Sequence, residues 1–315
     1  MYHGNKRFLQ GFNEMKIFSA LYFSAVISGL LLFTASCSKP QMSSEKKITV
    51  GAGLPPVASL VASIGGDKVE TVSLLPAGRT PHDFSPKPSD INTISKARVF
   101  FSSGMPFEEK SLVFLSKKML ISDISAEIKK IPQTGHSHKE QCSGNHCHSE
   151  NMDPHIWVSP ANLLIIAENI CTNLIKIDPA NALYYRKNTG LLKEKITTLD
   201  RYIRTRLAPY AGRTFFIYHP SLGYFAGEYA LNQRAVELDG REVSAVQLAQ
   251  LINLAKKQSN VVLFVQEEFN PRTAKAIAGQ LNATIKTMNP LQMDVLHFLR
   301  QITDDLADGF SGKKE

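Results

Sequence analysis

The stretch "DPANALYYRKNTGLLKEKITTLDRYIRTRLAPY", residues 178–210, decides the fold. Its apolar positions recur every three or four residues, at Leu183, Tyr184, Leu191, Leu192, Ile196, Leu199, Ile203 and Leu207. This spacing is typical of an α-helix with one buried face. Only Gly190 interrupts the pattern. We therefore predict a linking helix over residues 179–208, roughly 40 Å long at a rise of ~1.5 Å per residue, which is the length of a whole domain.

Short β-branched segments alternate with helical segments on both sides of this helix. Before it, "ITVGAG", "VETVSLL", "RVFFSSG" and "MLISDIS" read as strands, and "PVASLVASIG" and "SPANLLIIAENICTNLIKI" read as helices. After it, strands are predicted at "RTFFIYHP", "VVLFVQEE" and "TIKTMNP", with helices between and after them. Such alternation predicts parallel sheets covered by helices. The fold class is therefore α/β, with two Rossmann-like lobes, 48–178 and 209–315, joined by one long helix.

The N-terminus carries a membrane-targeting pattern. Lys16 precedes "IFSALYFSAVISGLLLFTAS", which has no charge and ends at Cys37. A positive segment followed by an apolar one predicts a secretory signal over residues 1–37, in which residues 1–14 are an upstream extension if Met15 is the start. The segment "TASC" resembles the lipobox of bacterial lipoproteins, although Thr34 replaces the usual leucine. We expect lipidation at Cys37; the alternative is a plain membrane anchor.

The remainder of the chain is expected outside the cytoplasm, on the periplasmic or cell-surface side, with residues 38–47 as a polar tether. A chain of 315 residues with 43% hydrophobic and 20% charged residues can bury its own core. The net charge of +8 comes without an arginine-rich helix or interleaved aromatic and basic residues, so nucleic acid is not an expected partner. A basic surface suits an anionic membrane face. Cys171 lies in an apolar helical pattern and is expected to be buried.

Three histidines lie next to prolines where loops meet helices or strands. His82 follows a strand in "PAGRTPHDF", His155 precedes a helix in "MDPHIWVSP", and His219 ends a strand in "FFIYHPSLG". Ligands of open α/β sheets bind at the carboxyl ends of the strands, so three such imidazoles can converge on one point. Imidazole nitrogen suits zinc and other divalent first-row metals. We therefore predict a metal site of His82, His155 and His219.

A three-histidine site with one open position also describes a catalytic zinc centre, so a zinc hydrolase is the alternative. The sequence has no H-E-x-x-H motif to support that alternative. Asp83 and Asp153 adjoin the predicted ligands, and we interpret them as carboxylates that orient the imidazole rings. The "GAG" after the first strand lacks the full dinucleotide fingerprint, so it is a weak nucleotide site.

Three longer segments resemble one family of proteins. "IGGDKVETVSLLPAGRTPHDFSPKPSD", "MDPHIWVSPANLLIIAENI" and "YHPSLGYFAGEYAL" are similar to the signature segments of the cluster A-I solute-binding proteins, metal-binding lipoproteins that feed ABC importers of zinc and manganese. The similarity runs in order from about residue 48 to 312. It implies two lobes joined by a rigid helix, no enzyme activity, and His82, His155 and His219 as ligands of a metal between the lobes. It also implies an ABC-transporter permease as partner; we expect a monomer.

The resemblance also bears on the choice of metal. Members that bind manganese resemble this chain with a glutamate in place of His219, so the histidine implies the zinc-uptake type, and three nitrogens favour Zn²⁺ over Mn²⁺. The family's fourth ligand is often an aspartate, where this chain has Asn289 in "MNPLQ". We leave the fourth position open between Asn289, Glu267 or Glu268, and water. A manganese- or iron-binding homologue and a surface adhesin lipoprotein are the alternative functions.

A metal-rich loop, residues 136–150, falls between the first two predicted ligands. It carries His136, His138, Cys142, His146, Cys147 and His148. Zinc-uptake members often carry such an insertion here. Many weak ligands on one flexible segment raise the local metal concentration, so we predict an auxiliary loop that collects zinc or senses its abundance. The alternative is a surface loop closed by a disulfide between its two cysteines, which an oxidising compartment would permit.

Overall fold

The computed structural model describes residues 47–81, 83–115, 119–133, 152–238, 241–242 and 244–312. The predicted signal segment with Cys37, the tether up to residue 46, His82 and the metal-rich loop lie outside these ranges. Within the described ranges, no helix is both long and apolar enough to cross a bilayer.

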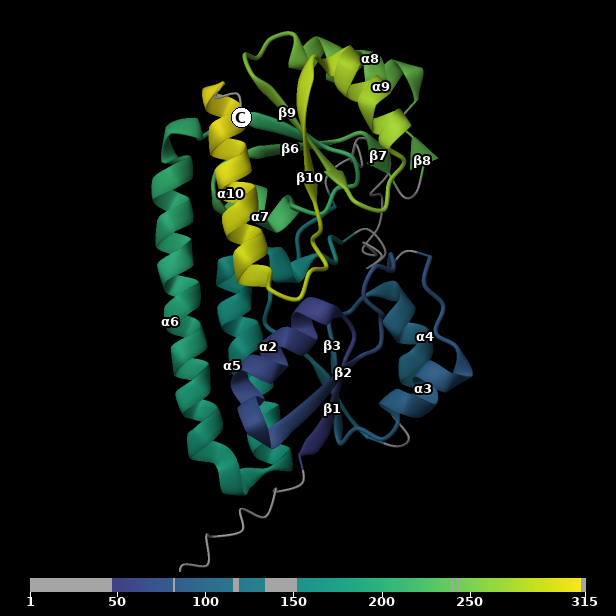
Figure 1. The fold of residues 1–315 in the computed structure, drawn as a ribbon, viewed down its shortest axis with the longest axis vertical. Helices are drawn as coiled ribbons and strands as arrows, with labels where there is room; N and C mark the ends of the chain where they lie inside the picture. Colours follow the sequence, from purple (N-terminus) through teal and green to yellow (C-terminus); the bar gives the residue numbers. More distant parts are fainter. Residues whose placement is uncertain are drawn as a thin grey trace, which may run out of the picture. The chain divides into compact units, whose positions relative to one another are not determined.

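The N-terminal lobe is built on a four-stranded parallel sheet in the order β2-β1-β3-β4 (Figure 1). Its strands are β1 (Ile48–Ala52), β2 (Val69–Ser73), β3 (Val99–Ser102) and β4 (Leu120–Asp123). Its helices are α2 (Pro55–Gly65), α3 (Pro88–Ile94), α4 (Pro106–Leu115) and α5 (Pro160–Ile177). Helix α2 packs on β1 and β2, and α5 packs on β3 and β4. The sequence did not predict α4.

The C-terminal lobe has a second four-stranded parallel sheet, in the order β10-β9-β5-β6. The strands are β5 (Thr214–Ile217), β6 (Asn232–Ala235), β9 (Val261–Gln266) and β10 (Ala283–Met288). The helices are α7 (Gly223–Glu228), α8 (Ala245–Ala255), α9 (Pro271–Leu281) and α10 (Val295–Ser311), and a short antiparallel ribbon pairs β7 (Glu237–Leu238) with β8 (Arg241–Glu242). The predicted fold class, two mostly parallel α/β lobes with a long helix between them, is confirmed.

Helix α6 (Ala182–Leu207) connects the lobes and packs on both of them. It contacts α2 and α5 of the N-terminal lobe and α10 of the C-terminal lobe (Figure 1). Its buried residues follow the helical repeat: Tyr185, Thr189, Leu192, Ile196, Leu199, Ile203 and Leu207. At 26 residues it is about 39 Å long. One unbroken helix that is packed along its length on both lobes resists bending between them.

Two apolar positions of the predicted helix face solvent. Leu183 is 85% exposed and Leu191 is 49% exposed. The buried face runs instead through Tyr185 and Thr189. The hydroxyl of Thr189 donates a hydrogen bond to the backbone carbonyl of Tyr185 at 2.8 Å, so it needs no partner outside the helix. The helix was predicted correctly, but its buried face was assigned partly to the wrong residues. A buried threonine reads as polar in the sequence, although its hydroxyl is hydrogen-bonded within its own helix.

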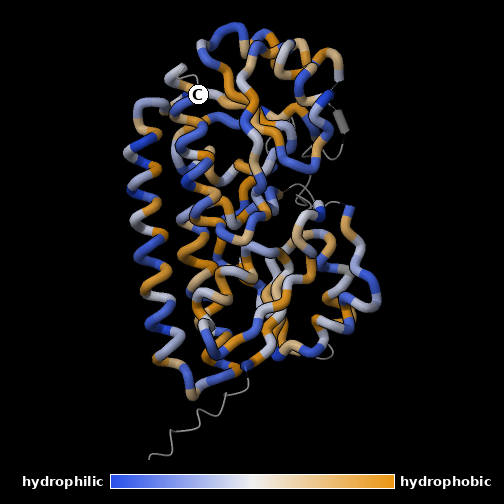
Figure 2. The backbone as a smooth tube through the Cα atoms, viewed as in Figure 1, coloured by the Kyte–Doolittle hydropathy of each residue, from blue (hydrophilic) through white to orange (hydrophobic). Residues whose placement is uncertain are grey.

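The hydrophobic core is shared between the lobes. One cluster of buried side chains includes Val50 on β1, Trp157 before α5, Phe225 on α7 and Phe298 on α10. A second cluster lies under α8 and α9. Figure 2 shows the hydrophobic colour concentrated in the strands and the inner helices, while α6 alternates along its length. Cys171 is buried within the first cluster, as predicted.

A buried carboxylate is bonded to the turn that follows β3 and lies against the turn that follows β1. Both oxygens of Glu108 on α4 accept hydrogen bonds: from the hydroxyls of Ser102 and Ser103 at 2.7 and 2.8 Å, and from the backbone amides of residues 103–105 at 2.9–3.2 Å. A Cβ on Gly53 would lie 1.5 Å from Oε1 of Glu108. A dinucleotide-binding fold holds phosphate at the turn after its first strand. In this chain, the carboxylate of Glu108 lies against that turn, at Gly53. Burial raises the pKa of Glu108, and these hydrogen bonds oppose the rise.

Candidate metal centre

His155 is held by the residue two positions before it. Its backbone amide donates to Oδ1 of Asp153 at 2.9 Å, and its ring Nδ1 lies 2.8 Å from the same oxygen. Both side chains are buried. The chain then turns through Ile156–Val158 into α5, whose N-cap Ser159 accepts from the amide of Asn162 at 3.2 Å. Asp153 thus orients the imidazole of His155, as its place beside that predicted ligand led us to expect. Asp83, in contrast, is exposed.

His219 lies two residues beyond β5 and is held by partners that are distant in sequence. Its Nδ1 is 2.8 Å from Oε2 of Glu237 on β7. The amide of Gln266, at the end of β9, brackets its backbone: Nε2 donates to the carbonyl of His219 at 2.7 Å, and Oε1 accepts from its N–H at 3.3 Å. Burial lowers the pKa of the His219 imidazole, while the bond with Glu237 opposes the shift. A neutral ring with its proton on Nδ1 presents the Nε2 lone pair to a metal.

The two imidazoles come together between the lobes. The ring centroids of His155 and His219 are 5.3 Å apart, with an angle of 70° between the ring planes. A carboxylate is bonded to Nδ1 in each ring, the same arrangement that orients histidines in known metal sites. Two of the three predicted imidazoles, from the two lobes and 64 positions apart in the chain, thus lie side by side.

A small cavity of about 10 Å³ lies against both rings. Its other lining residues are Pro81, Trp157, Ser221, Gln266, Glu268, Pro290 and Leu291. The indole Nε1 of Trp157 donates to the carbonyl of Pro290 at 2.8 Å and so joins the lobes at this wall. A cavity of this size holds about one water-sized sphere, which fits an ion rather than an organic molecule. In the described ranges, no group of three or more His, Cys, Asp or Glu could hold a metal ion; the third predicted ligand, His82, falls outside those ranges.

The structure separates the candidates for a fourth ligand. Glu268 lines the cavity, and both burial and the neighbouring charge of Glu267 raise its pKa. Asn289 is not among the lining residues. Its Oδ1 accepts from the amide of Leu291 at 2.9 Å, and its Nδ2 donates to Oε2 of Glu267 at 3.1 Å. Asn289 and Glu267 therefore bond with each other, while Glu268 faces the cavity.

Sequence reasoning missed Glu237 and Gln266. Neither residue belongs to a motif around His219, because they lie 18 and 47 residues further along the chain. The available signal was their position: both follow or end strands of the sheet that carries His219, at the carboxyl ends where ligands bind. Position alone predicts that such residues are near the site, but not which ring they hold.

Replacing Gly223 with alanine should disturb the His155 side of this site. A Cβ at Gly223, the first residue of α7, would lie 2.3 Å from Oδ2 of Asp153. The carboxylate must then move, and it is the group that holds Nδ1 of His155. Changes in residues that orient metal-binding histidines typically weaken metal affinity by about 10- to 100-fold, so we expect a loss of that size in a zinc competition titration.

Gly227→Ala is the matched control for this substitution. It lies on the same helix, and a Cβ there meets no atom within 4 Å. It should therefore leave zinc affinity at the wild-type value. Equal affinities for both variants would contradict the role assigned to Asp153.

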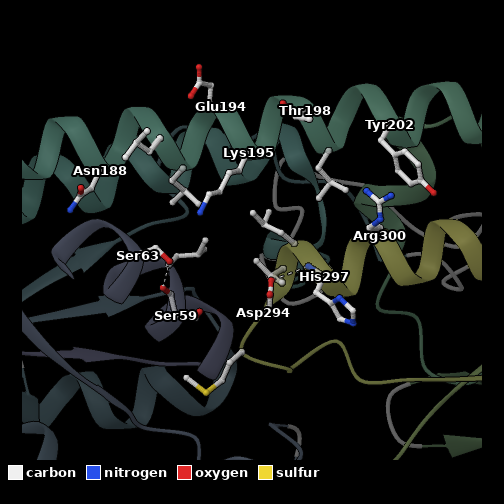
Figure 3. Close-up of a pocket in the computed structure, with 17 residues that line it drawn as sticks. Ser59, Ser63, Asn188, Glu194, Lys195, Thr198, Tyr202, Asp294, His297 and Arg300 are labelled. Atoms are coloured by element: carbon white, nitrogen blue, oxygen red, sulfur yellow. Dashed lines mark hydrogen bonds between the residues drawn. The ribbon is translucent and has the colours of Figure 1, made fainter. Parts of the chain in front are cut away.

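A larger groove, of about 970 Å³, lies apart from this centre (Figure 3). It is lined by residues of α2, α6 and the start of α10, among them Ser63, Lys195, His297 and Arg300. Figure 3 shows Lys195 and His297 on opposite sides of it. None of the predicted metal ligands lines this groove, so size alone does not identify the functional site.

Comparisons with known proteins give a consistent result. A family model described as "Zinc-uptake complex component A periplasmic" (ZnuA) matches residues 50–309. The high-affinity zinc uptake system protein ZnuA of Bacillus subtilis is 30% identical over 85% of this chain and 87% of its own length. A crystal structure of ZnuA superposes with a TM-score of 0.76 at 29% identity, covering 84% of this chain and 100% of that one. A zinc-bound deletion mutant of ZnuA superposes with the same TM-score at 28% identity, covering 84% and 98%.

Proposed function

The chain belongs to the ZnuA family of periplasmic zinc-uptake components, and from this premise we propose that His82, His155 and His219 are its zinc ligands. The family is a solute-binding component of transport and not an enzyme. This chain is accordingly an extracytoplasmic zinc-binding protein of an ABC importer, and Zn²⁺ is the cargo that it delivers to the membrane permease.

One observation carries the proposed ligand set. The ring centroids of His155 and His219 lie 5.3 Å apart, and Nδ1 of each ring is bonded to a buried carboxylate. This arrangement places two oriented imidazoles, which supply two nitrogen donors, at one ion-sized cavity. Pro81 lines the same cavity, which supports its neighbour His82 as the third donor. Three imidazoles favour zinc over the oxygen-preferring Mn²⁺. Among the fourth-ligand candidates, the cavity position of Glu268 supports this residue or water over Asn289.

The anchor and the metal-rich loop complete the proposal. Cys37 carries the lipid, residues 38–47 tether the lobes to the membrane, and the monomer works at that surface. The loop 136–150 collects zinc through His136, His138, Cys142, His146, Cys147 and His148. Support for both comes from the sequence pattern, since a series of weak ligands raises the local concentration of a metal beside a tight site.

Zinc titration of the purified mature chain, with and without residues 136–148, tests this function. The intact chain should bind about one zinc ion tightly and several more weakly. The shortened chain should keep the tight binding and lose the weak binding. A second titration against Mn²⁺ should show weaker binding of manganese at the tight site. A wild-type chain without a tight zinc would contradict the proposed function, and unchanged weak binding after the deletion would contradict the role of the loop.

A further inference from the structure

Helix α7 connects the two histidine segments. It begins four residues after His219 and lies along residues 153–161, the segment that carries His155. At its first turn, the hydroxyl of Tyr224 donates to the carbonyl of Asp153 at 3.2 Å. At its last residue, both carboxylate oxygens of Glu228 are bonded to the start of α5. A helix of the C-terminal lobe is thus attached at both ends to the N-terminal lobe.

Glu228 makes the strongest of these attachments. Its Oε2 accepts from the hydroxyl of Ser159 at 2.6 Å, and its Oε1 accepts from the amide of Ala161 at 3.3 Å. Its side chain is 11% exposed, and the guanidinium of Arg204 on α6 lies 3.5 Å from Oε1. A carboxylate at the first turn of the 18-residue α5 also faces the positive end of the helix dipole. Hydrogen bonds to an ionised acceptor are about twice as strong as neutral ones.

We infer that Glu228 is a positioning residue that latches the two lobes beside the metal and slows zinc release. The inference rests on the proposed function, because zinc must be held between His155 and His219 for the latch to act on it. Ser159 is four residues from His155, and the start of α7 is four residues from His219. When Glu228 is bonded to the start of α5, packing sets the separation of the His155 and His219 rings. When these bonds are broken, each histidine segment moves with its own lobe, and a donor nitrogen leaves the metal more often.

The test is stopped-flow release of Zn²⁺ into excess EDTA, with Glu228→Ala, Glu228→Gln and a control. Loss of charge-assisted hydrogen bonds should speed release about tenfold in Glu228→Ala. Glu228→Gln retains an acceptor oxygen and should fall between this variant and the wild type. Glu168→Ala removes the exposed ion pair of Glu168 with Lys193, which also joins α5 to α6, but does not touch α7. It should release zinc at the wild-type rate.

A spectroscopic measurement separates positioning from general loss of stability. Co²⁺ bound in place of zinc should show altered ligand-field bands in Glu228→Ala and bands nearer to wild type in Glu228→Gln. Wild-type release rates and cobalt spectra in both Glu228 variants would overturn the latch. If Glu228→Ala does not fold, release from Glu228→Gln at the wild-type rate overturns it equally. A wild-type chain that binds no tight zinc would instead contradict the proposed function itself.

Discussion

His155→Ala and His219→Ala should each abolish tight binding of one zinc ion. Each substitution deletes one donor nitrogen and leaves its orienting carboxylate, Asp153 or Glu237, beside an empty position in a cavity that admits about one ion. Removing even an outer partner of a metal-binding histidine weakens affinity about 10- to 100-fold, so loss of the histidine itself should exceed about 100-fold. A competition titration against a chromophoric zinc chelator measures the change. His82→Ala should have the same effect if it supplies the third donor.

His297→Ala is the control for these substitutions. His297 is exposed on α10 and lines the larger groove rather than the small cavity. It should bind zinc with wild-type affinity and stoichiometry. Wild-type affinity in either His155→Ala or His219→Ala would contradict the proposed centre, whatever the metal-rich loop binds.

Glu108→Ala should lower the free energy of unfolding by about 3 kcal/mol or more, because it leaves buried donors without their acceptor. The carboxylate is fully buried and serves two serine hydroxyls and the backbone turn after β3. The lost side chain also leaves a cavity against Gly53, which adds to the cost. Urea unfolding followed by circular dichroism measures the change.

Glu109→Ala provides the comparison for Glu108→Ala. Glu109 is the next residue of α4 but is exposed, so its replacement should alter stability by no more than about 0.5 kcal/mol. Equal effects of the two substitutions would show that the buried carboxylate does not organise the turn.

Periodicity predicted the elements with long, regular apolar patterns. The strands β1, β3, β5 and β9 and the helices α5, α6 and α10 all follow such patterns. Helix α4 escaped prediction because Glu108 occupies a buried position of "PFEEKSLVFL", so its inward face does not read as apolar. Helix α7 is only six residues long and contains two glycines, and β6, "NQRA", is a polar edge strand. Each of these elements is stabilised by tertiary contacts that local propensity does not contain.

The sequence predicted the contacts of the candidate site where the contacting residues are neighbours in the chain. Asp153 and His155 share one turn, so their relation followed from the sequence. The pairing of His219 with Glu237, the bracket from Gln266 and the closeness of His155 to His219 did not follow, because each joins distant segments.

By itself, the sequence determined the two-lobed α/β architecture, the linking helix, and histidines suited to a divalent metal where loops meet strands or helices. Residue type and local spacing carry these properties, since they depend on side-chain chemistry and on the repeat of a helix or strand. Only the tertiary structure decided that the imidazoles of His155 and His219 meet, that Glu237 holds the ring of His219, and that Glu108 is bonded to the turn after β3 and lies against Gly53. These depend on the packing of segments far apart in the chain, where a shift of about one residue in register exchanges buried and exposed side chains.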